Sequence, residues 1–178
     1  LIFFLYPLFV LIIFLRIFLK KEDKVRFKEK IFSSTFNYKR DFNKKLIWFH
    51  ASSIGELLSI VSLIKNINNE NKNIEFLVTT ATLSSANLFE KNLSGCSNII
   101  HRFFPLDVRF LVDSFLNTWR PDLVCFIDSE IWPNFLFNIN ERKIPLILLN
   151  ARITKKTLNK WKIFPKFAKK VFGNFDLC

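Results

Sequence analysis

The stretch that decides the fold is LIWFHASSIGE at residues 46–56, where an apolar run passes through small polar residues into the start of a helix. Residues 46–51 are mostly apolar, with β-branched and aromatic side chains, which predicts a buried strand. Apolar side chains then recur at helical spacing from Leu57 to Ile64. The stretch is therefore typical of a strand that leads directly into a helix.

The same pattern of an apolar run followed by helical spacing continues along the chain. Predicted strands lie at residues 76–80, 99–104, 123–127 and 146–150, and predicted helices at residues 83–93, 108–119, 132–141 and 155–172, the last with an interruption at Pro165. Such strand-then-helix units predict an α/β fold, a Rossmann-like parallel sheet with helices on both faces. Ligands of these sheets bind at the carboxyl ends of the strands, so the residues after each strand form the candidate site.

The net charge of +12 is concentrated in two segments that flank a nearly neutral middle. Residues 46–151 hold 8 Lys or Arg and 10 Asp or Glu, a net charge of −2. Residues 20–45 hold 10 basic and 4 acidic side chains, a net +6, and residues 152–170 hold 8 basic and no acidic ones. Because the predicted crevice lies in the neutral middle, this distribution argues against nucleic-acid binding and favours an anionic membrane surface as a partner.

Residues 1–19, LIFFLYPLFVLIIFLRIFL, are almost entirely apolar. As a helix they would span about 28 Å, close to the ~30 Å hydrocarbon core of a bilayer. A run of basic residues follows at once, which predicts that the rest of the chain lies on the cytoplasmic side. We therefore expect a membrane-anchor helix at residues 1–19, a basic linker at residues 20–45 and a Rossmann-like domain at residues 46–178. For the front end, a buried core helix, a hairpin or a shallow insertion stays open.

The turn after the first strand carries the first group of candidate site residues. Ser53, Gly55 and Glu56 stand where a strand turns into a helix, and the amide N–H groups of such a turn can face an anion or a polar ligand. A second interpretation stays open, in which Ser53 caps the helix and Glu56 complements its dipole.

The segment after the fourth strand, DSEIWPN, carries the second group. It places the carboxylates of Asp128 and Glu130 directly after an apolar strand, at the rim of the predicted crevice. The alternative is helix capping by Asp128 or Ser129, with Trp132 in the core.

Other features narrow the chemistry. Arg152 follows the fifth strand, where it either holds a phosphate or carboxylate or lies in solvent. His50 is typical of a core histidine, and neither it nor His101 has a cysteine or histidine at ligand spacing, so no metal site is predicted. Phosphate-binding loops and dinucleotide fingerprints are absent, so we expect no cofactor.

The basic helix at residues 155–172 carries an aromatic stripe that either packs on the sheet or lies on a bilayer surface.

Six segments stand in one order along the chain: WFHASSIGE, VTTAT, FPLD, WRPDL, DSEIWPN and IPLILLNARI. In that order they resemble the N-terminal domain of the 3-deoxy-D-manno-octulosonic acid (Kdo) transferases, a family of lipid A glycosyltransferases. The resemblance covers residues 46–178, and the apolar front end is similar to the membrane anchor of that family. Two positions differ from the family pattern, since Asp128 stands in place of a glutamate and Ser85 in place of a glycine.

The resemblance implies the N-terminal half of a GT-B enzyme that transfers Kdo from CMP-Kdo to a lipid A precursor (lipid IVA), with inversion, in lipopolysaccharide core biosynthesis. The implied site residues are Glu56 as general base and Ser53, Gly55, Asp128, Glu130 and Arg152 as acceptor-binding residues. CMP-Kdo would bind a C-terminal donor domain that this chain lacks, so the chain alone is expected to be inactive. The implied location is the cytoplasmic face of the bacterial inner membrane.

Two other functions stay open. One is a membrane-tethered module that binds anionic lipids through the two basic segments, and its binding would weaken with salt without depending on Glu56. The other is a GT-B enzyme that acts on a different lipid-linked sugar, which a comparison of donors would distinguish.

Overall fold

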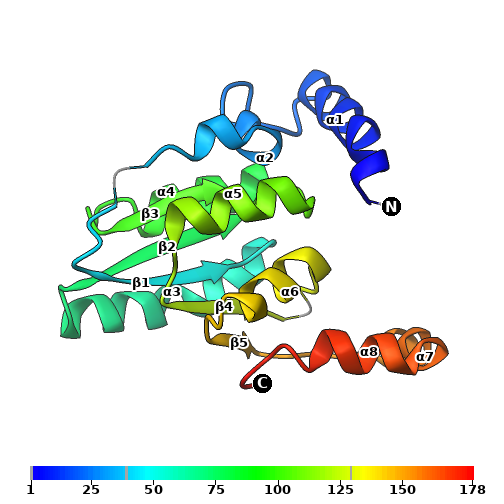
Figure 1. Ribbon diagram of the computed structural model, residues 1–178. Helices are drawn as coiled ribbons and strands as arrows, with labels where there is room; N and C mark the ends of the chain where they lie inside the picture. Colours follow the sequence, from blue (N-terminus) through cyan, green and yellow to red (C-terminus); the bar gives the residue numbers. More distant parts are fainter. Residues whose placement is uncertain (1, 39, 129) are drawn as a thin grey trace.

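The computed structural model describes residues 2–38, 40–128 and 130–178, with side chains from Tyr6 onward. At its centre is a five-stranded sheet in which every neighbouring pair is parallel and the order is β3-β2-β1-β4-β5 (Figure 1). The strands are β1 (Lys45–His50), β2 (Ile74–Thr80), β3 (Ile99–Phe103), β4 (Leu123–Ile127) and β5 (Leu146–Leu149). The first strand, β1, lies in the middle of the sheet, β2 and β3 follow on one side of it, and β4 and β5 follow on the other. The predicted Rossmann-like α/β fold is therefore confirmed.

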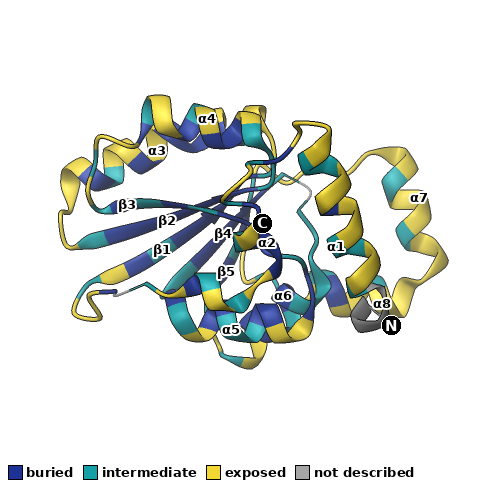
Figure 2. Ribbon diagram, turned by 90° about the horizontal axis from the view of Figure 1, so that it is seen from above, coloured by how far each residue is buried: buried dark blue, intermediate teal, exposed yellow. Residues whose placement is uncertain are grey.

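Helices cover both faces of the sheet (Figure 2). On one face lie α3 (Ile54–Glu70) and α4 (Leu83–Asn92), and on the other lie α5 (Arg109–Trp119) and α6 (Pro133–Glu141). The helices change face where the chain leaves β3 and crosses to β4 on the far side of β1. The boundary between β1 and β4 is therefore the switch point of the sheet, where α/β proteins of this kind bind ligands.

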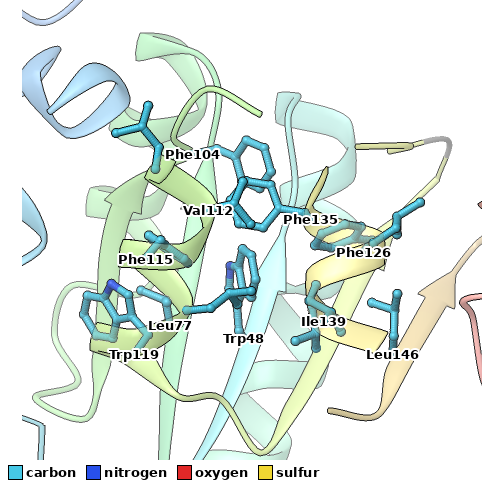
Figure 3. Packing of buried hydrophobic residues seen from close by; sticks show 14 of the residues in the cluster. Trp48, Leu77, Phe104, Val112, Phe115, Trp119, Phe126, Phe135, Ile139 and Leu146 are labelled. Atoms are coloured by element: carbon cyan, nitrogen blue, oxygen red, sulfur yellow. The ribbon is translucent and has the colours of Figure 1, made fainter. Parts of the chain in front are cut away.

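A large core cluster fills the space between the sheet and the helices α5 and α6 (Figure 3). Trp48 is fully buried there, and its ring centroid lies 5.0 Å from that of Phe115 and 5.5 Å from that of Phe135. The next residue, Phe49, belongs to a second cluster under α3 and α4. Successive residues of β1 thus point into two different cores, which explains why the strand is apolar on both faces.

The basic segment after β5 forms two helices, α7 (Lys155–Ile163) and α8 (Pro165–Phe172), so the predicted interruption at Pro165 is confirmed. Pro165 occupies the first turn of α8, where a missing N–H removes no helical hydrogen bond. After α8 the chain returns to the sheet, and the N–H of Leu148 donates to the carbonyl oxygen of Leu177 at 2.9 Å. This contact covers the outer edge of β5.

The front helix, α1 (Ile2–Phe18), packs along one side against the rest of the protein. The hydroxyl of Tyr6 donates to the carbonyl oxygen of Ile31 at 2.5 Å, and Ile13 is 5% exposed. The other side of the helix and its end expose apolar side chains to solvent: Leu8, Leu11, Ile12, Leu15, Phe18 and Leu19. Within the part of the chain that the structure describes, no helix combines the length and the apolarity needed to cross a bilayer. The membrane anchor and the domain boundaries stay predictions.

The segment between α1 and β1 is held to the domain by charged side chains. It contains α2 (Lys28–Ile31) and the 3-10 helix η1 (Ser33–Phe36). The Nζ of Lys30 bonds a carboxylate oxygen of Glu22 at 2.5 Å and donates to the carbonyl oxygen of Ala81 at 2.8 Å. The carboxylate of Glu29 accepts from the backbone N–H of Phe103 at 2.8 Å, on the outer edge of β3. The segment is thereby tied to the turn after β2 and to an edge strand.

We expect Phe115→Ala to lower the free energy of unfolding by about 3–5 kcal/mol, because it removes a fully buried ring and leaves a cavity beside Trp48. Urea unfolding followed by tryptophan fluorescence measures the loss. Phe42→Ala is the matched control, since Phe42 is 59% exposed and its truncation is expected to cost less than about 1 kcal/mol. Equal losses in the two variants would contradict a core centred on this face of the sheet.

Candidate active site

The carboxyl ends of three strands meet at one edge of the sheet. His50, the last residue of β1, is paired in register with Phe126 of β4. In the same way, Ile127 of β4 lies opposite Leu149 of β5. The segments that follow these strands, which carry all the candidate residues of the sequence, are therefore neighbours in space.

Glu56 lies in the first turn of α3, and two donors fix its half-buried carboxylate. Oε2 accepts from the backbone N–H of Ser52 at 2.7 Å, and Oε1 accepts from the hydroxyl of Ser53 at 2.8 Å. Ser53 is the N-cap of α3, and its Oγ accepts from the N–H of Glu56 at 3.3 Å. The capping geometry is therefore present. It leaves the carboxylate free acceptor positions, because each carboxylate oxygen can accept more than one hydrogen bond.

Gly55 stands beside Glu56 and is exposed. A Cβ at this position would meet no heavy atom of the described chain within 4 Å. The fold itself therefore has no steric need for glycine here. The missing side chain leaves the first turn of α3 open for a ligand to approach.

Glu130 points back toward β1 and is bound by two ring nitrogens. Its Oε2 lies 2.6 Å from Nε1 of Trp132 and 3.3 Å from Nε2 of His50. Burial alone raises the pKa of Glu130, but the hydrogen bonds from His50, Ser52 and Trp132 outweigh it and hold that pKa below its ordinary value. Glu130 is therefore a fixed anion at the switch point of the sheet at neutral pH.

His50 connects this anion to the protein interior. The ring is fully buried, and Nδ1 lies 3.0 Å from Oγ1 of Thr79, which also accepts from Nε1 of Trp48 at 2.8 Å. The ionised carboxylate of Glu130 can only accept hydrogen bonds, so the ring nitrogen that faces it carries a proton. We therefore assign the ring proton to Nε2, which donates to Glu130. The predicted core histidine is confirmed, and it also positions a carboxylate.

Ser52 and Ser85 join the turns around these groups. The N–H of Ser52 donates to Glu56, and its Oγ lies 3.2 Å from Nε2 of His50, so Glu56 and Glu130 belong to one network. Ser85 of α4 is fully buried, and its hydroxyl donates to the carbonyl oxygen of Ser52 at 3.2 Å. Ser85 thus ties the turn after β2 to the turn after β1.

Asp128, Asn150 and Arg152 form a second group, at the ends of β4 and β5. Oδ1 of Asp128 accepts from Nδ2 of Asn150 at 2.5 Å and lies 3.9 Å from Nε of Arg152. Asp128 and Asn150 have left-handed backbones, with φ of 60° and 53°, a conformation that is uncommon outside glycine and that gathers at functional sites. The Arg152 side chain is 72% exposed, and its role as an acceptor-binding residue stays a prediction.

Helix capping by Asp128, one of the two open interpretations, is wrong for α6. The carboxylate that caps this helix is that of Asp107, which accepts from the backbone N–H groups of Asn134 at 3.1 Å and Phe135 at 3.0 Å. Burial raises the pKa of Asp107, and these hydrogen bonds oppose the rise. Ser129, the other capping candidate, lies outside the described residues. In the chain Asp107 stands just before α5, so no local sequence signal indicates that it caps α6.

Asp122, in the WRPDL segment, has a similar structural role. Its carboxylate accepts from the backbone N–H of Leu46 at 2.8 Å and from Nη2 of Arg40 at 3.0 Å. The acidic residues of FPLD and WRPDL therefore hold the fold together, whereas those of HASSIGE and DSEIWPN follow the carboxyl ends of β1 and β4, where ligands of such sheets bind.

Metal ligation finds no support in the described part of the chain, where no group of three His, Cys, Asp or Glu side chains is placed to hold an ion. His101 bonds Oγ1 of Thr80 at 2.9 Å and Nη2 of Arg26 at 2.8 Å. Burial, together with the charges of Arg26 and Arg102, lowers the pKa of His101 to about 3. This ring is therefore neutral and belongs to the core.

Fold and site together define a Rossmann-like domain with two linked carboxylates at its switch point. A family model described as 3-Deoxy-D-manno-octulosonic-acid transferase (kdotransferase) matches residues 25–178. The chain therefore belongs to the Kdo transferase family, a family of glycosyltransferases.

Similar proteins are longer than this chain. The 3-deoxy-D-manno-octulosonic acid transferase of Rickettsia bellii is 37% identical over 176 residues, which are 98% of this chain and 40% of that protein. A probable mitochondrial 3-deoxy-D-manno-octulosonic acid transferase of Arabidopsis thaliana is 35% identical over 116 residues, 65% of this chain and 26% of that protein. The S. aureus MnaA-UDP co-structure gives a TM-score of 0.48 at 14% identity over 74% of this chain and 41% of that chain, too low to bear on function.

We expect Glu130→Gln to reduce the loss of folding stability that occurs at acid pH. Because the pKa of Glu130 is lowered in the folded state, its ionised form stabilises the fold above the ordinary value of 4.5, and this contribution is lost as the pH falls through the lowered pKa. The free energy of unfolding of the variant should therefore fall less steeply below about pH 4.5. Urea unfolding over a pH series measures the slope, with Glu70→Gln at the exposed end of α3 as control. An acid limb as steep as that of the unsubstituted protein would show that Glu130 is not held as an anion.

Proposed function

We propose that this chain is the acceptor-binding half of an inverting GT-B glycosyltransferase that transfers Kdo from CMP-Kdo to a lipid A precursor (lipid IVA) in lipopolysaccharide core biosynthesis. The observation that carries the proposal is the pair of carboxylates Glu56 and Glu130, linked through Ser52 and His50 at the switch point of a Kdo transferase family domain. Curated relatives are named as transferases of this sugar.

Glu56 is the proposed general base. An inverting displacement needs a base that takes the proton of the acceptor hydroxyl while the new glycosidic bond forms. The donors on Ser52 and Ser53 orient the carboxylate, and its remaining acceptor positions are available to that hydroxyl. Gly55 leaves room beside it for a sugar ring.

The other crevice residues are proposed to bind the acceptor. Glu130 is an oriented anion, so it is suited to accept a hydrogen bond from a second sugar hydroxyl. The exposed guanidinium of Arg152 and the N-terminus of α3, with Ser53 as its cap, supply positive potential for a phosphate of the lipid A precursor. Asp128 lies 3.9 Å from Nε of Arg152, close enough to influence the position of the guanidinium.

The donor CMP-Kdo is proposed to bind a second Rossmann-like domain, as the GT-B architecture implies. The match to the R. bellii relative covers 40% of that protein, which leaves it the length for such a domain. In this arrangement the acceptor crevice of the present domain faces the activated sugar across the gap between the domains.

We also propose that the protein acts on the cytoplasmic face of the bacterial inner membrane. Support comes from the apolar side of α1, where Leu11 and Leu15 are 55% and 56% exposed, and from the exposed lysines that follow it. Apolar side chains in the hydrocarbon boundary and lysines at anionic head groups are the usual pattern of membrane-bound helices.

We expect Glu56→Gln in the full-length protein to lower kcat for Kdo transfer by about 10²- to 10⁴-fold, with a small effect on the KM for the acceptor, because the amide cannot take the proton. Steady-state transfer to a lipid A precursor measures both constants. Glu90→Gln, on the exposed side of α4, is the matched control and should transfer normally. Near-normal turnover by Glu56→Gln would remove Glu56 as the base.

We expect the double variant Leu11→Lys/Leu15→Lys to bind vesicles of phosphatidylethanolamine and phosphatidylglycerol less tightly, because two lysines would replace the apolar side of α1. Co-sedimentation with the vesicles measures the bound fraction. The control Leu58→Lys/Leu63→Lys changes two exposed leucines of α3, which are 52% and 40% exposed. Equal binding by both double variants would contradict a membrane contact through α1.

A further inference from the structure

An apolar groove lies between β5 and the helices α7 and α8, with a volume of about 580 Å³. Its lining is formed by Asp128, Ile131, Leu148, Ala151, Arg152, Ile153, and by further residues of α7, α8 and the chain end. Figure 1 shows α7 and α8 extending away from the sheet beside β5. The groove therefore opens at the same end of the sheet as the candidate active site.

The walls of the groove are only partly covered by the protein itself. α7 has no buried residue, and Leu158, which lines the groove, is 38% exposed. Ile153, which also lines the groove, is 51% exposed. Apolar surface left in contact with water is unfavourable, so the groove gains free energy when an apolar group fills it.

The charge around the groove selects the kind of apolar group. Residues 152–170, which supply several of the lining residues, hold 8 basic and no acidic side chains. Lys162 and Arg152 are themselves part of the lining. An uncharged apolar ligand gains nothing from this charge, whereas an amphiphile with an apolar chain and an anionic head uses both features.

The position of the groove relative to the candidate active site indicates which amphiphile binds in it. Asp128 lines the groove, and Glu130, two residues further on, is held in the crevice by His50. Ile131, on the other side of Glu130 in the chain, also lines the groove, so the groove adjoins the segment that carries Glu130. We propose that the groove between β5 and α7–α8 binds one acyl chain of the phosphorylated glycolipid acceptor. This inference rests on the proposed function, because it assigns a second subsite to the same acceptor.

The groove predicts affinity that depends on chain length. Each methylene that enters an apolar groove should raise the affinity by about two- to fourfold. The probes are monoalkyl phosphates from hexyl to dodecyl phosphate, used below their critical micelle concentrations with the full-length protein, and titration calorimetry measures the affinities. Leu158→Lys places a charge in the groove and should abolish the dependence on chain length. Leu58→Lys makes the same change on α3, at a leucine 52% exposed, and should keep the dependence.

Transfer assays with an acylated and a deacylated lipid A precursor separate the acceptor from other lipids. We expect Leu158→Lys to raise the KM for the acylated acceptor at least tenfold and to leave transfer to the deacylated acceptor unchanged. Chain-length dependence without any Kdo transfer would contradict the proposed function and retain the groove as an acyl site. Kdo transfer that ignores acylation in both proteins would overturn the acceptor subsite, and would assign any chain-length dependence to membrane phospholipid. Equal chain-length dependence in Leu158→Lys and Leu58→Lys would overturn the groove itself.

Discussion

The two hydrogen bonds of the His50 ring are the constraint on which the site depends. Nδ1 is bound to Thr79 and Nε2 to Glu130, so one residue joins the interior of the sheet to an anion on its edge. A buried ring nitrogen without a partner would cost about 1–3 kcal/mol, which keeps both contacts in place. Trp48 lies two residues earlier on the same face of β1 and donates to the same threonine hydroxyl. The packing of the core and the geometry of the carboxylates are therefore coupled.

The acidic residues of the six ordered segments have two different roles in the structure. The carboxylates of Asp107 and Asp122 are turned inward, where they satisfy backbone N–H groups at the start of α6 and of β1. Those of Glu56 and Glu130 are turned toward the crevice and are held by side-chain and backbone donors near its rim. An acidic residue that takes part in chemistry and one that caps an element look alike in a sequence, since both stand at the end of an element.

The local sequence pattern predicts the helices and strands, but it does not predict the contacts between residues that lie far apart in the chain. The strand at residues 123–127 was predicted with the bounds it has, and the break at Pro165 was also correct, because apolar runs and proline act over a few residues. The capping of α6 was not predictable in this way, since Asp107 precedes Asn134 by 27 residues. The bond between His50 and Glu130 spans 80 residues and depends on the pairing of β1 with β4. The turn after β1 already indicated Glu56 as a candidate, whereas its role as a base came only from the resemblance to a family and stays a prediction.

The outer strands of the sheet carry a further consequence. Backbone groups at the free edge of a sheet are templates for pairing with another chain, and proteins usually cover or charge such edges. Here the carboxylate of Glu29 accepts a hydrogen bond from the N–H of Phe103 on β3, and Leu177 pairs with β5 at the other edge of the sheet. Both covers come from outside the alternating strand–helix units, one from before β1 and one from after α8. A shortened version of the protein that kept only those units would lose Phe36 from its main core and would expose both edges of the sheet, so it would be less stable and would also tend to self-associate.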